Sequence, residues 1–181
     1  MNTYTISGKW LNDLMEDLSG NDRACVILAG AVLDDRVKTL LQKYLLPPRG
    51  EKEDKLLGPS RPLESFASRV EIARRLNLIS EDARKSLDDI RHIRNRAAHK
   101  IDFSFGANSV MDRVNNVLQT MQLQIRAPSL LTPPYNSPKG KFVAAVVILV
   151  LCLDIEIGET GTTVHSPTNA LANFSFSNGQ S

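Results

Sequence analysis

FVAAVVILVLCL, residues 142–153, is a run of twelve consecutive apolar side chains near the carboxyl end of the sequence. Five of the twelve residues are valine or isoleucine, which favours a β-strand. A strand needs partner strands, however, and the remainder of the sequence predicts helices only. We therefore expect a buried helix over 142–153, with a strand as the alternative, and an all-α fold built around it.

The same apolar run is too short to cross a bilayer, because a membrane-spanning helix needs about 18–20 apolar residues. Lys139 and Lys141 precede the run, and Asp154 and Glu156 follow it, so neither end can be extended. The first residues, MNTYTISGKW, also lack the basic and apolar regions of a signal peptide. We expect a cytoplasmic protein without membrane contact.

Five further segments place apolar residues at the spacing of an amphipathic helix. In chain order they are a segment from Trp10 to Leu18, one capped by Asp22 and running to about Leu46, one beginning near Pro62, one from Ser80 through Ala97, and one from about Ser109 to Ile125. Proline-rich stretches at 47–62 and 127–140 are expected to be loops. The sequence thus predicts a bundle of about five to six helices.

Length and composition predict one domain followed by a tail. Of the 181 residues, 42% are hydrophobic but only 6% are aromatic, so the core must consist mainly of aliphatic side chains and alanine. From about Gly158 the chain becomes rich in glycine, threonine, serine and asparagine. We expect a helical domain over 1–157 and a disordered tail over 158–181.

The basic residues concentrate in one part of the chain. The formal net charge is only +2, yet residues 61–100 hold ten basic and six acidic side chains, a local excess of +4. Such an excess is typical of a surface that binds an anionic partner. The alternative is that these arginines and lysines simply solvate the outer faces of helices.

Two cysteines, Cys25 and Cys152, are too few for a disulfide scaffold or a four-ligand zinc site. Both lie in predicted helices and outside basic clusters, so we expect sequestered and unreactive thiols. The sequence contains no clustered set of carboxylate, cysteine and histidine ligands. We therefore expect neither a metal nor another cofactor.

The residue types with chemical potential gather in RHIRNRAAHK, residues 91–100. On a helix, Arg91, Asn95 and His99 are four residues apart and share one face. Arg94 lies on the neighbouring stripe with Ile90 and Ala97, which we expect to point toward the bundle. A histidine can transfer protons near neutral pH, and an arginine can hold a phosphate by two hydrogen bonds. Asn95 could orient His99 or the substrate.

Structural roles explain the same residues without catalysis. His99 could cap the carboxyl end of its helix, where a cation or a hydrogen-bond donor is favourable. Arg94 could form an ion pair with Asp88 or Glu71. His92 is expected to be exposed to solvent or to a partner. An arginine followed five residues later by a histidine also occurs by chance in many proteins.

The arrangement Arg94-Asn95-x-x-x-His99, late in a long helix of an all-α domain, resembles the signature of the HEPN superfamily. Members are small helical bundles, typically dimeric, and the active ones are metal-independent ribonucleases. The resemblance implies that Arg94 and His99 of both protomers meet across a dimer cleft. There a ribose 2′-hydroxyl would attack the adjacent phosphate, with His99 transferring a proton and Arg94 stabilising the transition state. Asn95 corresponds to the polar residue that often follows the arginine.

A second resemblance covers more of the chain. Residues 58–99 are similar to the core of the mannitol operon repressor (MltR-like) family, through Leu63, Ser65, Arg69, the break at 76–79 and the segment 90–99. The likeness extends over roughly 20–157. Asn77 departs from the glycine common at that place, although asparagine also tolerates the left-handed conformation of a helix end. This resemblance implies a transcriptional regulator, yet no helix-turn-helix pattern is present.

The two resemblances agree on the fold and differ on function, which resides in sites rather than folds. Our first expectation is an RNA-binding protein that acts as a metal-independent endoribonuclease, with Arg94, Asn95 and His99 as catalytic residues. Arg91, Arg96 and Lys100 would then bind phosphate, RNA or a partner. The alternative is a non-enzymatic regulator that acts through protein–protein contacts. We expect a homodimer, because Ala97 and Ala98 are small and Arg94 lies on an apolar stripe. RNA, a regulatory protein and an antitoxin are the candidate partners.

Overall fold

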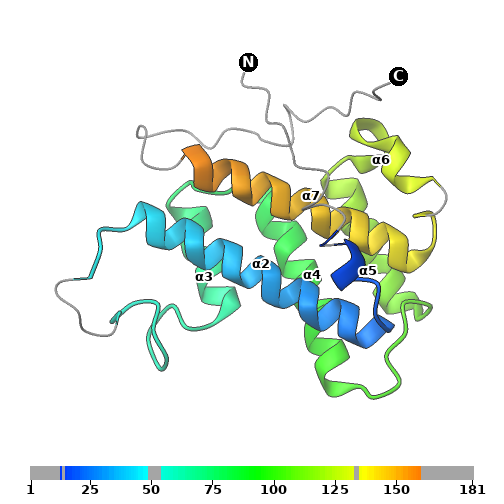
Figure 1. The fold of residues 1–181 in the computed structure, drawn as a ribbon, viewed down its shortest axis with the longest axis horizontal. Helices are drawn as coiled ribbons and strands as arrows, with labels where there is room; N and C mark the ends of the chain where they lie inside the picture. Colours follow the sequence, from blue (N-terminus) through cyan, green and yellow to red (C-terminus); the bar gives the residue numbers. More distant parts are fainter. Residues whose placement is uncertain (1–12, 14, 49–53, 133–134, 160–181) are drawn as a thin grey trace.

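The computed structural model describes residues 13, 15–48, 54–132 and 135–159 (Figure 1). Within these ranges the secondary structure is entirely helical, which confirms the all-α prediction. The longer helices are α2 (Asp22–Tyr44), α3 (Phe66–Arg75), α4 (Glu81–His99), α5 (Asn108–Thr120) and α7 (Pro138–Glu159). A short helix α6 (Leu123–Arg126) and a 3-10 helix η1 (Pro128–Leu131) connect α5 to α7.

The apolar run 142–153 forms the middle of helix α7, so the expected helix is confirmed and the strand alternative is wrong. All twelve of its side chains are buried. Helix α2 lies along α7 and also packs against α3 and α4, while α5 contacts both α4 and α7 (Figure 1). A helix that is apolar on every side is stable only when neighbours surround it. Even so, α7 falls short of a membrane span, as does every other helix in the described ranges.

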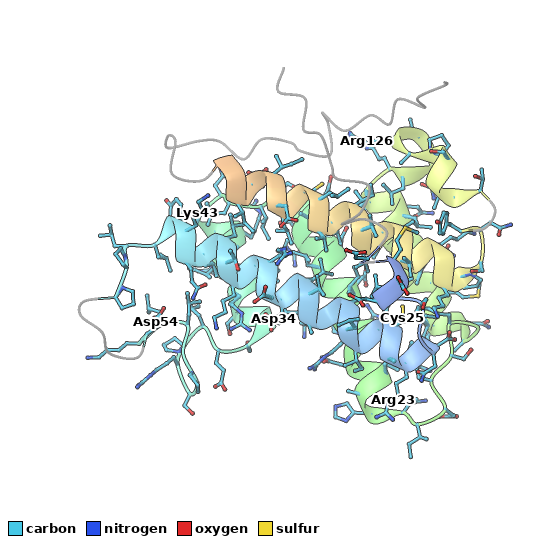
Figure 2. The ribbon with its side chains drawn as sticks, in the orientation of Figure 1. Arg23, Cys25, Asp34, Lys43, Asp54 and Arg126 are labelled. Carbon is cyan, nitrogen blue, oxygen red and sulfur yellow. The ribbon has the colours of Figure 1, made fainter. Side chains whose placement is uncertain are left out.

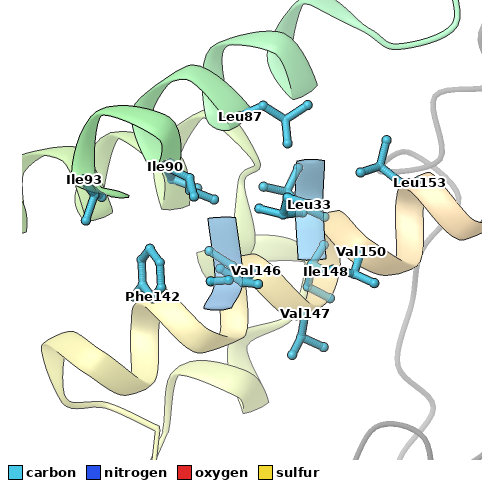
Figure 3. Packing of buried hydrophobic residues seen from close by; sticks show 14 of the residues in the cluster. Leu33, Leu87, Ile90, Ile93, Phe142, Val146, Val147, Ile148, Val150 and Leu153 are labelled. Carbon is cyan, nitrogen blue, oxygen red and sulfur yellow. The ribbon is translucent and has the colours of Figure 1, made fainter. Parts of the chain in front are cut away.

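The core consists mainly of aliphatic side chains, as the low aromatic content predicts. Figure 3 shows Leu33 of α2 between α4, which supplies Leu87 and Ile90, and α7, which supplies Val146 and Val150. Each fully buried aliphatic side chain of this kind contributes about 1.5–3 kcal/mol. The core therefore fixes α4 against both long helices and so determines which face of α4 reaches solvent.

Most helix ends follow local capping rules. Ser65 and Ser80 accept hydrogen bonds from the amides of Ser68 and Ala83 and so cap α3 and α4. The break after α3 is a left-handed residue, Asn77, with φ of 60°. The amide of Leu78 donates to the carbonyl of Ala73, and that of Asn77 to Arg74, which is the Schellman arrangement.

Two predicted helix starts are wrong. Helix α2 is capped by Asn21, whose side chain accepts from the amide of Ala24 at 2.9 Å, whereas Asp22 is the first helical residue. Helix α3 begins at Phe66 instead of near Pro62. Pro62 is the second residue of a turn closed by a hydrogen bond from Glu64 to Arg61, which is a favourable place for proline.

Two corrections concern the segment between α5 and α7. The predicted helix from Ser109 to Ile125 is broken at Gln122, which is left-handed with φ of 53°. The predicted loop 127–140 contains η1 and the first turn of α7. Pro138 is the first residue of α7, where its missing N–H costs nothing, and Ser137 accepts a hydrogen bond from Gly140.

Some predictions lie largely outside the described residues. Of the first predicted helix, the described part shows helix at Asp13 and over 15–17, and Leu18 is fully buried. The division of the chain at 157 and the character of residues 160–181 stay predictions, and helix α7 extends to Glu159.

Candidate functional site

The carboxyl half of α4 carries all six residues singled out in the sequence. Ile90, Ile93 and Ala97 face the core, so the intervening side chains are directed to the outside of the bundle. Arg94, His99 and Lys100 are exposed, and Arg91, Asn95 and Arg96 are half-buried. Arginine and histidine in the last turn are favourable because the helix dipole places partial negative charge there.

Arg94 does not point into the bundle as the helical spacing predicts. Its aliphatic stem lies across α2 at Gly30: a Cβ atom on this glycine would be 2.8 Å from Cγ of Arg94. The glycine thus provides the space in which α2 and α4 approach each other. The guanidinium reaches solvent, and its Nη1 donates to Oδ1 of Asn95 at 3.2 Å.

Arg94 and Asn95 are therefore brought together, but His99 is not joined to them. Five residues along a helix correspond to a rotation of about 140°, so Arg94 and His99 diverge around the axis. No hydrogen bond links these two side chains in the part of the chain that the structure describes. Within one chain they do not form a single site.

The structural role foreseen for Arg94 is also wrong. Asp88 forms ion pairs with Arg84 at 2.6 Å and with Arg91 at 3.2 Å, and Glu71 pairs with Arg75 at 2.7 Å. Neither carboxylate contacts Arg94. Among the described residues, no ion pair involves Arg94, Arg96 or Lys100. Of the predicted binding residues, only Arg91 has its charge compensated.

Arg23, at the start of α2, is a site residue that the sequence did not reveal. Its Nε donates to the carbonyl oxygen of Ala97 at 2.9 Å, and its Nη2 donates to that of Ala98 at 3.3 Å. It therefore satisfies two of the last carbonyls of α4, a role that the structural alternative assigned to His99. Figure 2 places Arg23 beside the carboxyl end of α4. Arg23 and Ala97 are 74 residues apart in the sequence, so no local pattern indicates their contact.

We call the surroundings of the carboxyl end of α4 the α4-end surface, defined by Arg23, Arg91, Arg94, Asn95, Arg96, His99 and Lys100. These side chains surround the helix end on different sides, since Arg94 and Arg96 are about 160° apart around the axis. The amino half of α4 differs, because residues 81–90 hold four acidic and only two basic side chains. Glu81 accepts hydrogen bonds from Arg84 and Arg74, and these two bonds lower the pKa of Glu81 to about 2. Positive charge without a carboxylate partner is therefore concentrated at one end of the helix.

The structure removes Ala97 from the predicted dimer contact, which was based on the small size of Ala97 and Ala98. Ala97 is fully buried in the core of its own chain, beside Ile93, and only Ala98 is partly accessible. Ala97 is therefore unable to contact a second protomer. The homodimer stays a prediction that rests on the resemblance.

Both cysteines are buried free thiols. Burial raises the pKa of the Cys25 thiol to about 11 and that of Cys152 to about 12, so both are neutral and unreactive at physiological pH. In the described ranges, no three histidine, cysteine or acidic side chains are grouped as metal ligands would be.

Comparison with solved structures identifies a protein of the same fold. The structure of the MtlR–HPr complex from Escherichia coli matches with a TM-score of 0.52 and 20% sequence identity, covering 84% of this chain and 98% of that chain. The chain thus has an MtlR-like fold, as the second resemblance implies. No family model and no curated protein sequence matches the chain.

Proposed function

We propose that the protein is a non-enzymatic regulator that acts by binding another protein. The observation that carries this proposal is the likeness of fold to MtlR, which was solved in complex with a protein, HPr, and is matched over almost its whole length. The proposal corresponds to the alternative that the sequence offered. It replaces ribonuclease activity as the preferred function.

The arrangement of side chains supports binding more directly than catalysis. The buried thiols are protonated, and Arg94 and His99 are not joined within the chain. Exposed arginine and lysine side chains without carboxylate partners are typical of surfaces that receive an oppositely charged partner. The α4-end surface can therefore bind a partner without any chemical step.

The ribonuclease stays a second candidate because Arg94 and His99 are both exposed and, within the described ranges, neither is engaged in an ion pair. Two copies related by a two-fold axis could bring these residues together. Such a contact would also bring the cations of two α4-end surfaces close to each other, which is unfavourable unless an anion lies between them. This candidate requires dimerisation, whereas the regulator does not.

The proposal is tested by cross-linking the tagged protein in its own host, treating the sample with ribonuclease, and purifying it. Purified HPr is then titrated calorimetrically as one defined partner. The proposal predicts a protein that co-purifies in a fixed ratio after RNA has been removed. Recovery of no such protein, together with cleavage of RNA in EDTA that His99→Ala abolishes, would establish the ribonuclease instead.

A further inference from the structure

We propose that the α4-end surface is the docking site and that its occupant is an acidic protein face with an apolar contact for Ile101. This inference rests on the proposed function and adds the location and the chemistry of the partner. It is carried by the charge of the α4-end surface, by the exposure of Ile101, and by the fixed backbone around that isoleucine.

The charge of this surface is available to an external anion. Arg94, Arg96 and Lys100 have no carboxylate partner in the described structure, and the guanidinium of Arg23 lies against the same helix end. Asp102 is the only acidic residue over 91–107. The helix dipole offsets only part of this charge, since it amounts to about half a negative unit. An acidic surface would complement the remainder.

Ile101 provides a second observation. Its side chain is 91% exposed, directly after Lys100 at the carboxyl end of α4. A single exposed apolar residue is common, but this one is held in place on both sides. The amide of Lys100 donates to Arg96 before it, and Phe103 and Phe105 are buried after it.

The following segment is fixed by further contacts. The rings of Phe103 and Phe105 meet edge to face with centroids 5.6 Å apart, and Phe105 also contacts Phe142 of α7 at 5.1 Å. The amide of Phe105 donates to Asp22 at 3.2 Å. Ile101 therefore lies between the end of α4 and an anchored segment, which limits the ordering that binding would require.

The same observations favour a protein over RNA. Proteins that bind single-stranded RNA stack the bases on exposed aromatic rings. Both phenylalanines over 91–107 are buried in the core, so the exposed rings there are only the imidazoles of His92 and His99. The most exposed apolar group is an isoleucine, which offers no ring to a base. A protein face can contact both the aliphatic side chain and the cations that surround it.

The experiment uses the isotope-labelled full chain and a short peptide of glutamates around a central leucine. Amide and methyl chemical shifts are followed by NMR during titration with this peptide, with the same peptide carrying serine in place of leucine, and with a uridine oligonucleotide of equal charge. We expect shifts confined to Arg23 and residues 91–102, and weaker binding of the serine peptide. Shifts elsewhere, no shifts, or tighter binding of the oligonucleotide would overturn the inference.

Variants define the contribution of each group. Arg94→Glu combined with Arg96→Glu should weaken peptide binding about tenfold, because two surface attractions become repulsions. Ile101→Ser should remove the difference between the leucine and serine peptides. Lys85→Glu, on the exposed face near the other end of α4, is the matched control and should change binding little. Circular dichroism and denaturation midpoints establish that each variant is folded.

Failure of this inference differs from failure of the proposed function. If the cross-linked partner is recovered equally well with the Arg94→Glu/Arg96→Glu protein, the regulator stands and this docking site is wrong. If no partner is recovered but the peptide perturbs Arg23 and residues 91–102, the regulator is wrong and the surface retains its affinity for acidic protein segments.

Discussion

The Nε atom of Arg23, at the start of helix α2, donates a hydrogen bond of 2.9 Å to the carbonyl oxygen of Ala97 in the last turn of α4. A side chain from the first turn of α2 thereby caps the last turn of α4. This contact adds a cation to the α4-end surface and also satisfies backbone groups that would otherwise depend on water.

Replacing Arg23 by alanine should expose those carbonyls and loosen the last turn of α4. We expect a loss of about 1 kcal/mol in the free energy of unfolding, the usual net contribution of such hydrogen bonds. Amide exchange should accelerate over the last turn of α4. Arg75→Ala is the control, because its ion pair with Glu71 is largely exposed and contributes little. Equal effects of the two variants in urea denaturation would contradict the assigned role.

Gly30 should be coupled to Arg94. Alanine is normally the better helix former by about 1 kcal/mol. At position 30, however, its Cβ would overlap Cγ of Arg94, so Gly30→Ala should destabilise the protein and displace the arginine. In an Arg94→Ala background the same change should be less costly. A double-mutant cycle measures this difference, and additive effects would show that the two residues are independent.

Asp34→Asn should be more damaging than Arg23→Ala. The carboxylate of Asp34 accepts from Nε and Nη2 of Arg69 at 2.9 and 2.7 Å, and Nη1 of Arg69 donates to the carbonyl of Leu63. The side chain of Arg69 is only 8% exposed. Leaving this charge without its partner should cost about 3 kcal/mol.

Chemical denaturation of Asp34→Asn and Asp35→Asn tests this expectation. The side chain of Asp35 is 66% exposed, so its substitution should change stability by less than about 0.5 kcal/mol. Similar losses in the two variants would show that the pair between Asp34 and Arg69 is not a principal link between α2 and α3.

Alkaline pH should destabilise the protein through its two thiols. Burial raises the pKa of Cys25 to about 11 and that of Cys152 to about 12, whereas an unfolded cysteine titrates near about 8.5. Above that pH the unfolded chain releases protons that the folded chain retains, so stability falls as pH rises. Each thiol adds up to about 1.4 kcal/mol per pH unit to this decline.

The Cys25→Ala/Cys152→Ala variant isolates that contribution. It is expected to be less stable at neutral pH because cavities are formed, but its free energy of unfolding should fall less steeply between about pH 8.5 and 10.5. Urea denaturation at a series of pH values gives both slopes. If the free energy of unfolding fell equally steeply with pH in the wild type and the variant, the thiols would not lose their protons on unfolding.

The fold was accessible from sequence because its main determinants are local. Ser80 caps α4 through the amide three residues away, as predicted, and Asn77 ends α3 in a left-handed conformation. The helix over 142–153 followed from the lack of any predicted strand that could pair with it. The start of α3 and the end of α5 were predicted wrongly. Neither the turn at Pro62 nor the left-handed conformation of Gln122 leaves a periodic signal in the sequence.

The candidate site was only partly accessible. The sequence located the basic segment 91–100, but not the conformation of Arg94, because the space beside it is created by Gly30 on another helix. Arg23 was missed for the same reason: helical spacing does not report which residues meet from different helices. The exposure of Ile101 was also missed, although the buried Phe103 follows it by only two residues.

The most direct test of the central claim is quantitative recovery of a cross-linked protein partner from ribonuclease-treated cells. We predict that the wild-type protein and Lys85→Glu recover the same partner in equal amounts, and that Arg94→Glu/Arg96→Glu recovers about tenfold less. Recovery of no protein partner by the wild-type chain would contradict a protein-binding regulator that docks through its α4-end surface.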